Sequence, residues 1–307
     1  MRIAMMGAGG VGGYFGGRLA ASGCDVTFIA RGRHLEAIRN NGLRIDSRDV
    51  GDATIDPAVA TDAPADVGVV DYVIVGVKLW DTEDVGRAIA PMVAPDTTVL
   101  SLQNGVECDE TLASVVGAKH LIGGVAFIAS SIREPGVIEH IGTMQRVVVG
   151  ERAGGSSRRV ELLHEMMLQA GITAEVSDDI ERTIWEKFVF LVGLSATTTM
   201  LRTTLGPIRE DPEKRKLLLN IMRETVAVGR AKGIDLPEDY ADDRLAFADG
   251  LPADMTSSMH HDLKAGNRLE VAWLSGAVAR FGDEVGVATP VNQTVLAALR
   301  PHATPRS

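Results

Sequence analysis

A glycine-rich segment close to the amino terminus constrains the fold of this chain more than any other feature. An apolar, strand-like run ends at Met6 and leads directly into the sequence GAGGVG. A helix-compatible stretch, Tyr14 to Ser22, comes next, and a second strand-like run, Val26 to Ile29, follows it. In such a strand–turn–helix unit, the three glycines permit the tight turn, the approach of a pyrophosphate and close helix packing, and the helix start holds the phosphates. We therefore predict a dinucleotide-binding site made by Gly7, Ala8, Gly9, Gly10, Val11 and Gly12.

The residues after the second strand indicate which dinucleotide binds. An NAD site carries Asp or Glu about 20 residues past the motif, where the carboxylate bonds the ribose 2′-hydroxyl. This chain has Ala30-Arg31-Gly32-Arg33 at that place. A guanidinium can bind a 2′-phosphate through two parallel hydrogen bonds, whereas a carboxylate would repel it. We predict NADP(H) as the cofactor, bound by Arg31; the alternative is that Arg31 is an ordinary solvated arginine.

Short β-branched runs alternate with helical stretches through the first half of the chain. Residues 71–77 and 97–102 have the composition of buried strands. This alternation predicts an α/β domain with a parallel, doubly wound sheet of the Rossmann type. Ligands bind at the carboxyl ends of the strands in such sheets. Arg31, Lys78 and Asn104 all follow predicted strands, so we expect them at that edge.

The second half of the chain has a different pattern. After a β-rich stretch with a turn at Pro135-Gly136 and a helix over 158–170, the strand signals fade near residue 178. We predict a Rossmann domain over 1–178 and an all-helical substrate domain over 179–307. The expected helices of the second domain cover residues 180–200, 213–232, 237–248, 256–263, 268–281 and 291–299.

Composition excludes several classes of function. The chain has 307 residues, of which 45% are hydrophobic and 23% charged, so a sizeable core is expected. Its formal charge of −10 disfavours nucleic acid and polybasic membrane binding. Cys24 and Cys108 lack metal-ligand spacing, so we expect reduced thiols, no metal site and a cytoplasmic protein. No apolar run is expected to span a membrane, and the initial strand leaves no room for a signal peptide.

Two stretches of the helical half could contain chemical groups. Lys187 begins a long apolar run, and desolvation among apolar neighbours would lower its pKa and make it a usable proton donor. The alternative is a lysine whose stem packs while its ammonium reaches water. Glu270 is expected in an apolar helix, where it is either a functional carboxylate or a cap or ion-pair partner. The adjacent His260 and His261 point in different directions on a helix, so they do not predict a metal site.

The ordered set of short motifs resembles the ketopantoate reductase family, whose members use NADPH to reduce 2-dehydropantoate to pantoate in pantothenate biosynthesis. The resemblance covers essentially the whole chain. Its motifs are GAGGVGG at 7–13, FIAR at 28–31, VGVK at 75–78, QNG at 103–105, PGVIEH at 135–140, WEKF at 185–188, SSMHHDLKAG at 257–266 and LEV at 269–271.

The resemblance implies roles for individual residues. Lys187 matches the family's general acid, Glu270 its active-site glutamate and Ser258 its substrate-binding serine. Lys78 and Asn104 match positions that contact the cofactor and the reacting groups, and Ala129 matches a cofactor-contacting position. It also implies a small 2-oxo acid as substrate and a helical domain like the carboxyl-terminal domain of 6-phosphogluconate dehydrogenase. Helical domains of this kind often pair, so a homodimer is one expected assembly.

One departure from the family concerns the substrate. The family usually carries asparagines that face the substrate four and eight residues after the lysine, so the resemblance places Leu191 and Ser195 of this chain among the substrate-binding residues. A further family asparagine, before a later glycine, is Leu205 in this chain. Burying the hydroxyls of pantoate against leucine would cost about 1–3 kcal/mol each. Three interpretations stay open: ketopantoate reduction itself, reduction of a different, more apolar carbonyl compound, and a non-catalytic NADP(H) sensor. Because Lys187 and Glu270 are retained, the sensor is the least favoured of the three.

Overall fold

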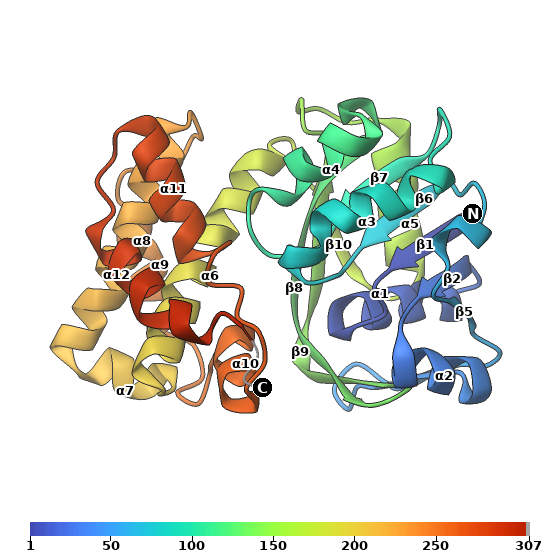
Figure 1. The fold of residues 1–307 in the computed structure, drawn as a ribbon, viewed down its shortest axis with the longest axis horizontal. Coiled ribbons are helices and arrows are strands. Elements are labelled where there is room, and N and C mark those ends of the chain that lie inside the picture. The colour runs from blue at the N-terminus through green and yellow to red at the C-terminus, as the bar shows by residue number, and fades with distance from the viewer. Residues whose placement is uncertain (305–307) are drawn as a thin grey trace. The chain divides into compact units, whose positions relative to one another are not determined.

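The computed structural model describes residues 1–304, and the chain divides into two compact units, Met1–Thr183 and Ile184–Ser307. The first unit holds all the strands labelled in Figure 1, and the second is helical. The boundary predicted near residue 178 stays a prediction; the first helix of the helical half, α6 (Ile180–Leu201), begins just after it. The predicted fold class, a Rossmann-type sheet followed by a helical domain, is confirmed.

Six parallel strands form the core of the first unit. In spatial order they are β5 (Val59–Thr61), β2 (Asp25–Ile29), β1 (Arg2–Met6), β6 (Tyr72–Val75), β7 (Thr98–Ser101) and β8 (Leu121–Glu134). The chain builds outward from β1 in one direction and then returns to build from β6 in the other. This is the doubly wound order of dinucleotide-binding domains, with its switch point between β1 and β6.

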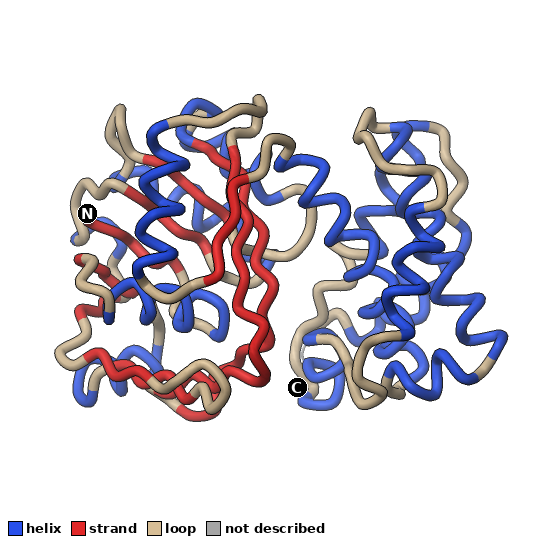
Figure 2. Tube along the Cα trace, turned by 180° about the vertical axis from the view of Figure 1, so that it is seen from behind, coloured by secondary structure: helices blue, strands red, loops and turns tan. Residues whose placement is uncertain are grey.

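A long hairpin extends the sheet and makes it mixed. Strand β8 turns at Pro135-Gly136 into the antiparallel β9 (Val137–Gly150), visible as the long red pair in Figure 2. The sequence predicts two separate runs where β9 is one strand, because a register irregularity after Ile128 lets the pairing continue. The far edge of β9 pairs with β3 (Leu43–Asp46), itself paired with β4 (Ala53–Ile55), and with β10 (Thr173–Val176).

Helices cover both faces of the sheet because alternate strand residues point to opposite sides. Ile3 and Met5 of β1 join one core with α1 (Gly10–Ala21), α2 (Gly32–Asn41) and α5 (Arg158–Gln169). Ala4 and Met6 join a second core with α3 (Thr82–Ile89) and α4 (Cys108–Val116). The first core includes aromatic side chains such as Tyr14 and Phe28, whereas the second consists of aliphatic side chains and methionines.

The helical unit is organised around one central helix. Helix α8 (Pro212–Ala231) contacts α7 (Leu205–Glu210), α9 (Tyr240–Asp249), α11 (Ser275–Val285) and α12 (Pro290–Leu299). Glycines let α6 and α8 approach closely, because a Cβ at Gly193 would lie 2.7 Å from Met222 and one at Gly229 would lie 2.8 Å from Trp185. The short α10 (Ser258–Ala265) follows α9.

Two expectations are wrong. The helix predicted from Arg268 begins only at Ser275, because Gly266 ends α10 in the left-handed conformation and the chain then makes a turn at residues 271–274. The expectation that no apolar run is long enough to span a membrane is also wrong. Among residues 1–304, α6 is long and apolar enough to cross a membrane by length and composition. Its apolar window is 61% buried inside the protein, as in a core helix, because α6 packs on α8.

Candidate functional site

The carboxyl ends of four neighbouring strands lie level with one another. Met6 at the end of β1 pairs with Ile29 of β2 and Val75 of β6, and Val75 pairs with Ser101 of β7. The segments that follow these strands therefore leave the sheet at the same edge. They contain the sequence-predicted residues Gly7 to Gly12, Arg31, Lys78 and Asn104.

The glycine-rich loop needs its glycines for different reasons. Gly7 has φ +99°, and a Cβ there would lie 2.7 Å from Val77 Cγ1. A Cβ at Gly12 would overlap the carbonyl oxygen of Gly7, so only glycine lets α1 pack this closely on the turn. A Cβ at Gly9 would meet no atom within 4 Å. The backbone at Gly9 thus faces open space, as the approach of a pyrophosphate requires.

Hydrogen bonds fix the loop and orient the start of α1. The N–H groups of Gly7 and Ala8 both donate to the Ile29 carbonyl, each at 3.1 Å, and the Gly13 N–H donates to the Gly9 carbonyl at 2.6 Å. By helix geometry, the N–H groups of the first turn, at Gly10 to Gly12, have no intrahelical acceptor. N–H groups without acceptors and the positive end of a helix dipole both favour an anion, so this geometry is compatible with the predicted pyrophosphate site.

Three other predicted cofactor residues follow β2, β6 and β7. Arg31 is exposed and immediately precedes α2, in an extended conformation. Lys78 is half-buried, with its Nζ atom 5.8 Å from the centre of the Trp80 ring. Asn104 is also half-buried, and its carbonyl accepts a hydrogen bond from the Cys108 thiol at 3.5 Å. An arginine next to the second strand fits the charge of a 2′-phosphate.

Strand β8 passes over the start of α1. A Cβ at Gly10 would lie 2.9 Å from Ser131 Cα, so the strand and the helix are in direct backbone contact. Ala129 is exposed and lies at the register irregularity of β8, next to this contact. The Ser130 hydroxyl oxygen is buried and has no hydrogen-bond partner within residues 1–304. Ala129 therefore lies next to the segment of β8 that contacts the start of α1, and its contact with the cofactor stays a prediction.

Gln103 links two of the loops at the strand ends through hydrogen bonds, a role that its sequence pattern does not indicate. Its amide nitrogen donates to the Thr82 hydroxyl at 2.8 Å and reaches the Lys78 carbonyl at 3.4 Å. Its amide oxygen accepts from the Ser101 hydroxyl at 3.1 Å. The side chain therefore ties the loop after β6 to the loop after β7.

In the helical unit, α6 presents the predicted catalytic lysine and two of the departures from the family. Lys187 and Leu191 are half-buried and lie one turn apart. Ser195, a further turn along, is 1% exposed, and its hydroxyl has no hydrogen-bond partner within the described chain. Leu205 is fully buried at the start of α7. Leu205 is thus a core side chain of the helical unit. The leucine that stands here in place of the family's asparagine therefore contributes to packing.

Two neighbouring serines have different environments. Ser257 is buried, caps α10 through the His260 N–H at 3.2 Å and lies 3.0 Å from the Thr198 hydroxyl. Ser258, the predicted substrate-binding residue, is exposed at the first position of α10. Of the two, Ser258 is therefore the one accessible to a ligand.

Glu270 lies in the irregular segment directly before the turn at residues 271–274, and not in the predicted helix. Its side chain is buried at 6% exposure, and its carbonyl accepts from the N–H groups of Trp273 at 3.0 Å and Leu274 at 3.2 Å. The turn fixes the backbone of Glu270 just before α11. No group of three or more His, Cys, Asp or Glu within residues 1–304 is arranged to hold a metal ion.

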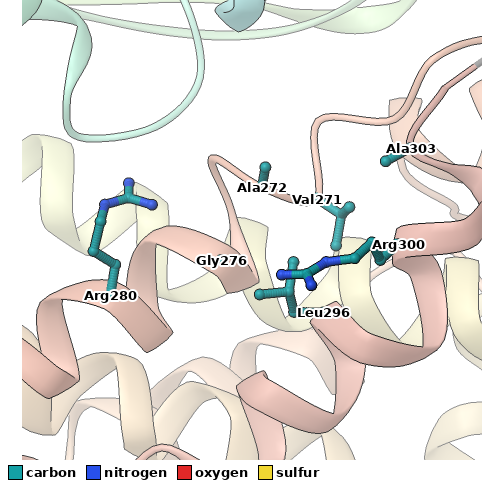
Figure 3. A pocket seen from close by; sticks show the side chains of 7 residues that line it. All are labelled: Val271, Ala272, Gly276, Arg280, Leu296, Arg300 and Ala303. Carbon is teal, nitrogen blue, oxygen red and sulfur yellow. The ribbon is translucent and has the colours of Figure 1, made fainter.

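A pocket of about 170 Å³ lies in the helical unit (Figure 3). It is lined by Val271, Ala272, Gly276, Arg280, Leu296, Arg300 and Ala303. In Figure 3 the Arg300 side chain extends toward Leu296, whereas Arg280 points away from the other lining side chains. None of the sequence-predicted site residues lines this pocket, so it does not correspond to the predicted site.

Comparison with known proteins identifies the family. The models described as "Ketopantoate reductase PanE/ApbA" and "Ketopantoate reductase PanE/ApbA C terminal" match residues 3–154 and 179–303. The 2-dehydropantoate 2-reductase of Mesorhizobium japonicum is 32% identical over 327 residues, which cover 100% of this chain and 99% of the relative.

Solved structures agree with this result. A crystal structure of 2-dehydropantoate 2-reductase from Geobacter metallireducens GS-15 has 36% identity and a TM-score of 0.91, and the match covers 98% of this chain and 99% of that chain. A D-mandelate dehydrogenase solved with NADH and anilino(oxo)acetate shares the fold, with 23% identity, a TM-score of 0.88 and coverage of 99% and 98%. The chain is an oxidoreductase that belongs to the ketopantoate reductase family.

Proposed function

We propose that this protein uses NADPH to reduce the keto group of a small 2-oxo acid, 2-dehydropantoate, to the corresponding 2-hydroxy acid. The observation that carries the proposal is the match of the chain over its whole length to 2-dehydropantoate 2-reductases. Because Cys24 and Cys108 are both thiols, we also propose a cytoplasmic location. A homodimer stays a prediction.

The geometry of the strand ends supports a nicotinamide dinucleotide. The first-turn N–H groups of α1 would bind the pyrophosphate, and the open backbone at Gly9 would let it approach. Arg31, exposed at the start of α2, would bind a 2′-phosphate, which favours NADPH. Lys78, Asn104 and Ala129 would contact the cofactor near the same loop.

The reaction needs a hydride and a proton. When bound, NADPH supplies the hydride that adds to the ketone carbon. Lys187 polarises the carbonyl and donates its proton to the developing alkoxide oxygen, a contribution typically worth about 10²–10⁴-fold in rate. Asn104 would orient the substrate and the nicotinamide, and the exposed Ser258 hydroxyl would bond the substrate carboxylate. Glu270 would hold either the substrate hydroxyl or the nicotinamide end of the cofactor.

A second candidate is a related reductase of a more apolar 2-oxo acid. The half-buried Leu191, one turn after Lys187, is the observation that favours it. Leucine cannot form a hydrogen bond with a substrate hydroxyl, so a substrate without that hydroxyl would lose no binding free energy at Leu191. Both candidates keep the same cofactor and the same proton donor.

The two candidates can be separated by following NADPH oxidation at its absorbance band. The assay compares ketopantoate with bulkier 2-oxo acids, using the wild type, Lys187→Ala and the exposed-lysine control Lys216→Ala. Turnover of ketopantoate that is lost in Lys187→Ala, and retained in Lys216→Ala, supports ketopantoate reduction. Turnover only of an apolar oxo acid supports the second candidate. Tight NADPH binding without turnover of any of these acids would overturn both and favour a sensor.

A further inference from the structure

One imidazole connects the glycine-rich loop to two distant segments. His34 lies on the first turn of α2, three residues after Arg31, and its Nε2 atom is 2.8 Å from the Ala8 carbonyl oxygen. The Gly136 N–H, at the turn between β8 and β9, donates to His34 Nδ1 at 3.0 Å. The half-buried imidazole is therefore bonded through both of its nitrogens.

These two contacts define the protonation state of His34. Because Gly136 donates to Nδ1, that nitrogen must carry a lone pair, so the proton lies on Nε2 and is donated to the Ala8 carbonyl. A doubly protonated ring would place an N–H group against the Gly136 N–H. Burial lowers the pKa of His34 below its ordinary value of 6.5, which favours the neutral ring that this arrangement requires.

The segments that His34 joins are themselves held tightly. Gly136 has φ +83°, a Cβ on it would lie 3.1 Å from Ala37 Cβ on α2, and its carbonyl accepts from the Arg44 N–H at 2.9 Å. The tip of the β8–β9 hairpin therefore packs directly on α2 and is also hydrogen-bonded to β3. Ala8, at the other side of the imidazole, precedes Gly9 and the first-turn N–H groups of α1.

We propose that His34 is a positioning residue for the dinucleotide site: its Nε2–H bond to Ala8 holds the peptide planes of the glycine-rich loop so that the first-turn N–H groups face the pyrophosphate. The proposal rests on the proposed cofactor site. In this proposal, a histidine outside the glycine motif orients the loop. The hydrogen bond from Gly136 has a separate role, which is to orient the imidazole ring.

The two bonds can be removed one at a time. In His34→Gln the side-chain amide can still donate from the position of Nε2 to Ala8, but the Gly136 contact is lost. In His34→Asn the amide oxygen can still accept from Gly136, but the Ala8 contact is lost. His164→Asn provides a matched control, because His164 lies on α5 and its Nε2 atom is 3.0 Å from the carbonyl oxygen of Ala174 on β10. Each variant thus loses one hydrogen bond between an imidazole and the backbone.

The experiment is a calorimetric titration of each purified protein with NADPH, together with its unfolding midpoint and its steady-state kcat and KM. We expect His34→Asn to raise the NADPH Kd and KM by about tenfold, with kcat changed less than about twofold at saturating NADPH. His34→Gln and His164→Asn should bind NADPH within about threefold of the wild type, although all three variants lose some thermal stability.

Other results would overturn the inference. Equal NADPH affinities in His34→Asn and His34→Gln, at similar unfolding midpoints, would mean that the Ala8 bond has no role in orienting the loop. A loss of kcat at saturating NADPH in place of a rise in Kd would also contradict it. If the wild type binds no NADPH, the proposed cofactor itself is wrong, and this outcome is distinguishable from the first two.

Discussion

The amide nitrogen of Gln103 donates a hydrogen bond to the hydroxyl of Thr82 at 2.8 Å, and this bond joins the loops that follow two neighbouring strands of the sheet. Thr82 in turn donates to the Leu79 carbonyl at 2.8 Å, so the chain of bonds continues into the segment after Lys78. Gln103 is 9% exposed. A buried network of this kind holds its members rigidly when every polar group is satisfied.

We predict that Gln103→Leu weakens cofactor binding as well as stability. The substitution keeps the volume but removes the donor to Thr82 and the acceptor for Ser101, so the unfolding free energy should fall by about 1–3 kcal/mol. Because Lys78 and Asn104 flank this network, the NADPH Kd should rise by about three- to tenfold. Denaturant unfolding and calorimetric titration measure the two effects.

Gln145 supplies the control for this prediction. It is 7% exposed on β9, and its amide nitrogen donates to the Gly171 carbonyl and the Thr173 hydroxyl, each at 3.2 Å. Gln145→Leu should cost similar stability and leave the NADPH Kd unchanged, because it lies outside the loops at the strand ends. Equal Kd values for both variants would show that Gln103 acts on stability alone.

The preference between NADPH and NADH should depend on Arg31. Arg31→Ala removes the guanidinium that we assign to the 2′-phosphate, so KM for NADPH should rise by about ten- to a hundredfold while KM for NADH changes less than about twofold. Arg33→Ala, two residues further along and also exposed, is the control. If the NADPH to NADH ratio of KM is the same in Arg31→Ala and the wild type, the assignment to NADPH is wrong.

A buried carboxyl group in the first unit should make its stability depend on pH. Burial raises the pKa of Asp109 from 3.8 to about 7, only partly opposed by the Arg152 guanidinium, while Glu181 and Glu110 raise it further. Arg152 Nε lies 3.9 Å from Asp109 but 2.7 Å from Glu181. Arg152 therefore keeps a nearer partner if Asp109 loses its charge.

The sign follows from the direction of the shift. The unfolded chain ionises Asp109 near pH 4, whereas the folded protein keeps it protonated up to about pH 7, so this group lowers the unfolding free energy as pH rises through that range. Asp109→Asn removes the effect. Its stability relative to the wild type should grow by about 1–3 kcal/mol between pH 5 and pH 8 in denaturant unfolding. The exposed control Asp84→Asn should show no such growth.

Local patterns were enough to predict the glycine-rich loop and the strands on either side of α1. The motif, its flanking strands and the return of the chain after β2 are encoded within about 30 contiguous residues, and each local preference agrees with the fold. The level strand ends then follow from the parallel pairing, so Arg31, Lys78 and Asn104 could be assigned to one edge of the sheet.

Contacts between distant segments could not be predicted in the same way. His34 and Gly136 are 102 residues apart, and nothing in the pattern around either residue indicates the other. The turn that holds Glu270 depends on how α10 ends at Gly266, which periodicity alone does not reveal. The separate environments of Ser257 and Ser258 likewise depend on the position of Thr198, which belongs to another helix.

The substrate should be decided by the face of α6 that carries Lys187. Leu191→Asn places an amide one turn after the lysine and keeps the number and branching of the side-chain heavy atoms. It should raise kcat/KM for ketopantoate and lower it for an apolar 2-oxo acid, each by about tenfold, if the second candidate is correct. Ser195→Asn enlarges a fully buried side chain, so it is expected to cost stability and is tested only in combination with Leu191→Asn.

Met200→Asn is the control for this series. Met200 is half-buried on the same helix as Leu191 but lies on the opposite side, because each helical residue turns by 100°. It should leave the ratio of kcat/KM values for the two substrates unchanged. If neither Leu191→Asn nor the double variant improves ketopantoate turnover, the leucine does not limit this substrate. If the wild type is already active on ketopantoate and Leu191→Asn loses this activity, the methyl groups of Leu191 themselves contact the substrate. That result would support the first candidate, which is reduction of ketopantoate.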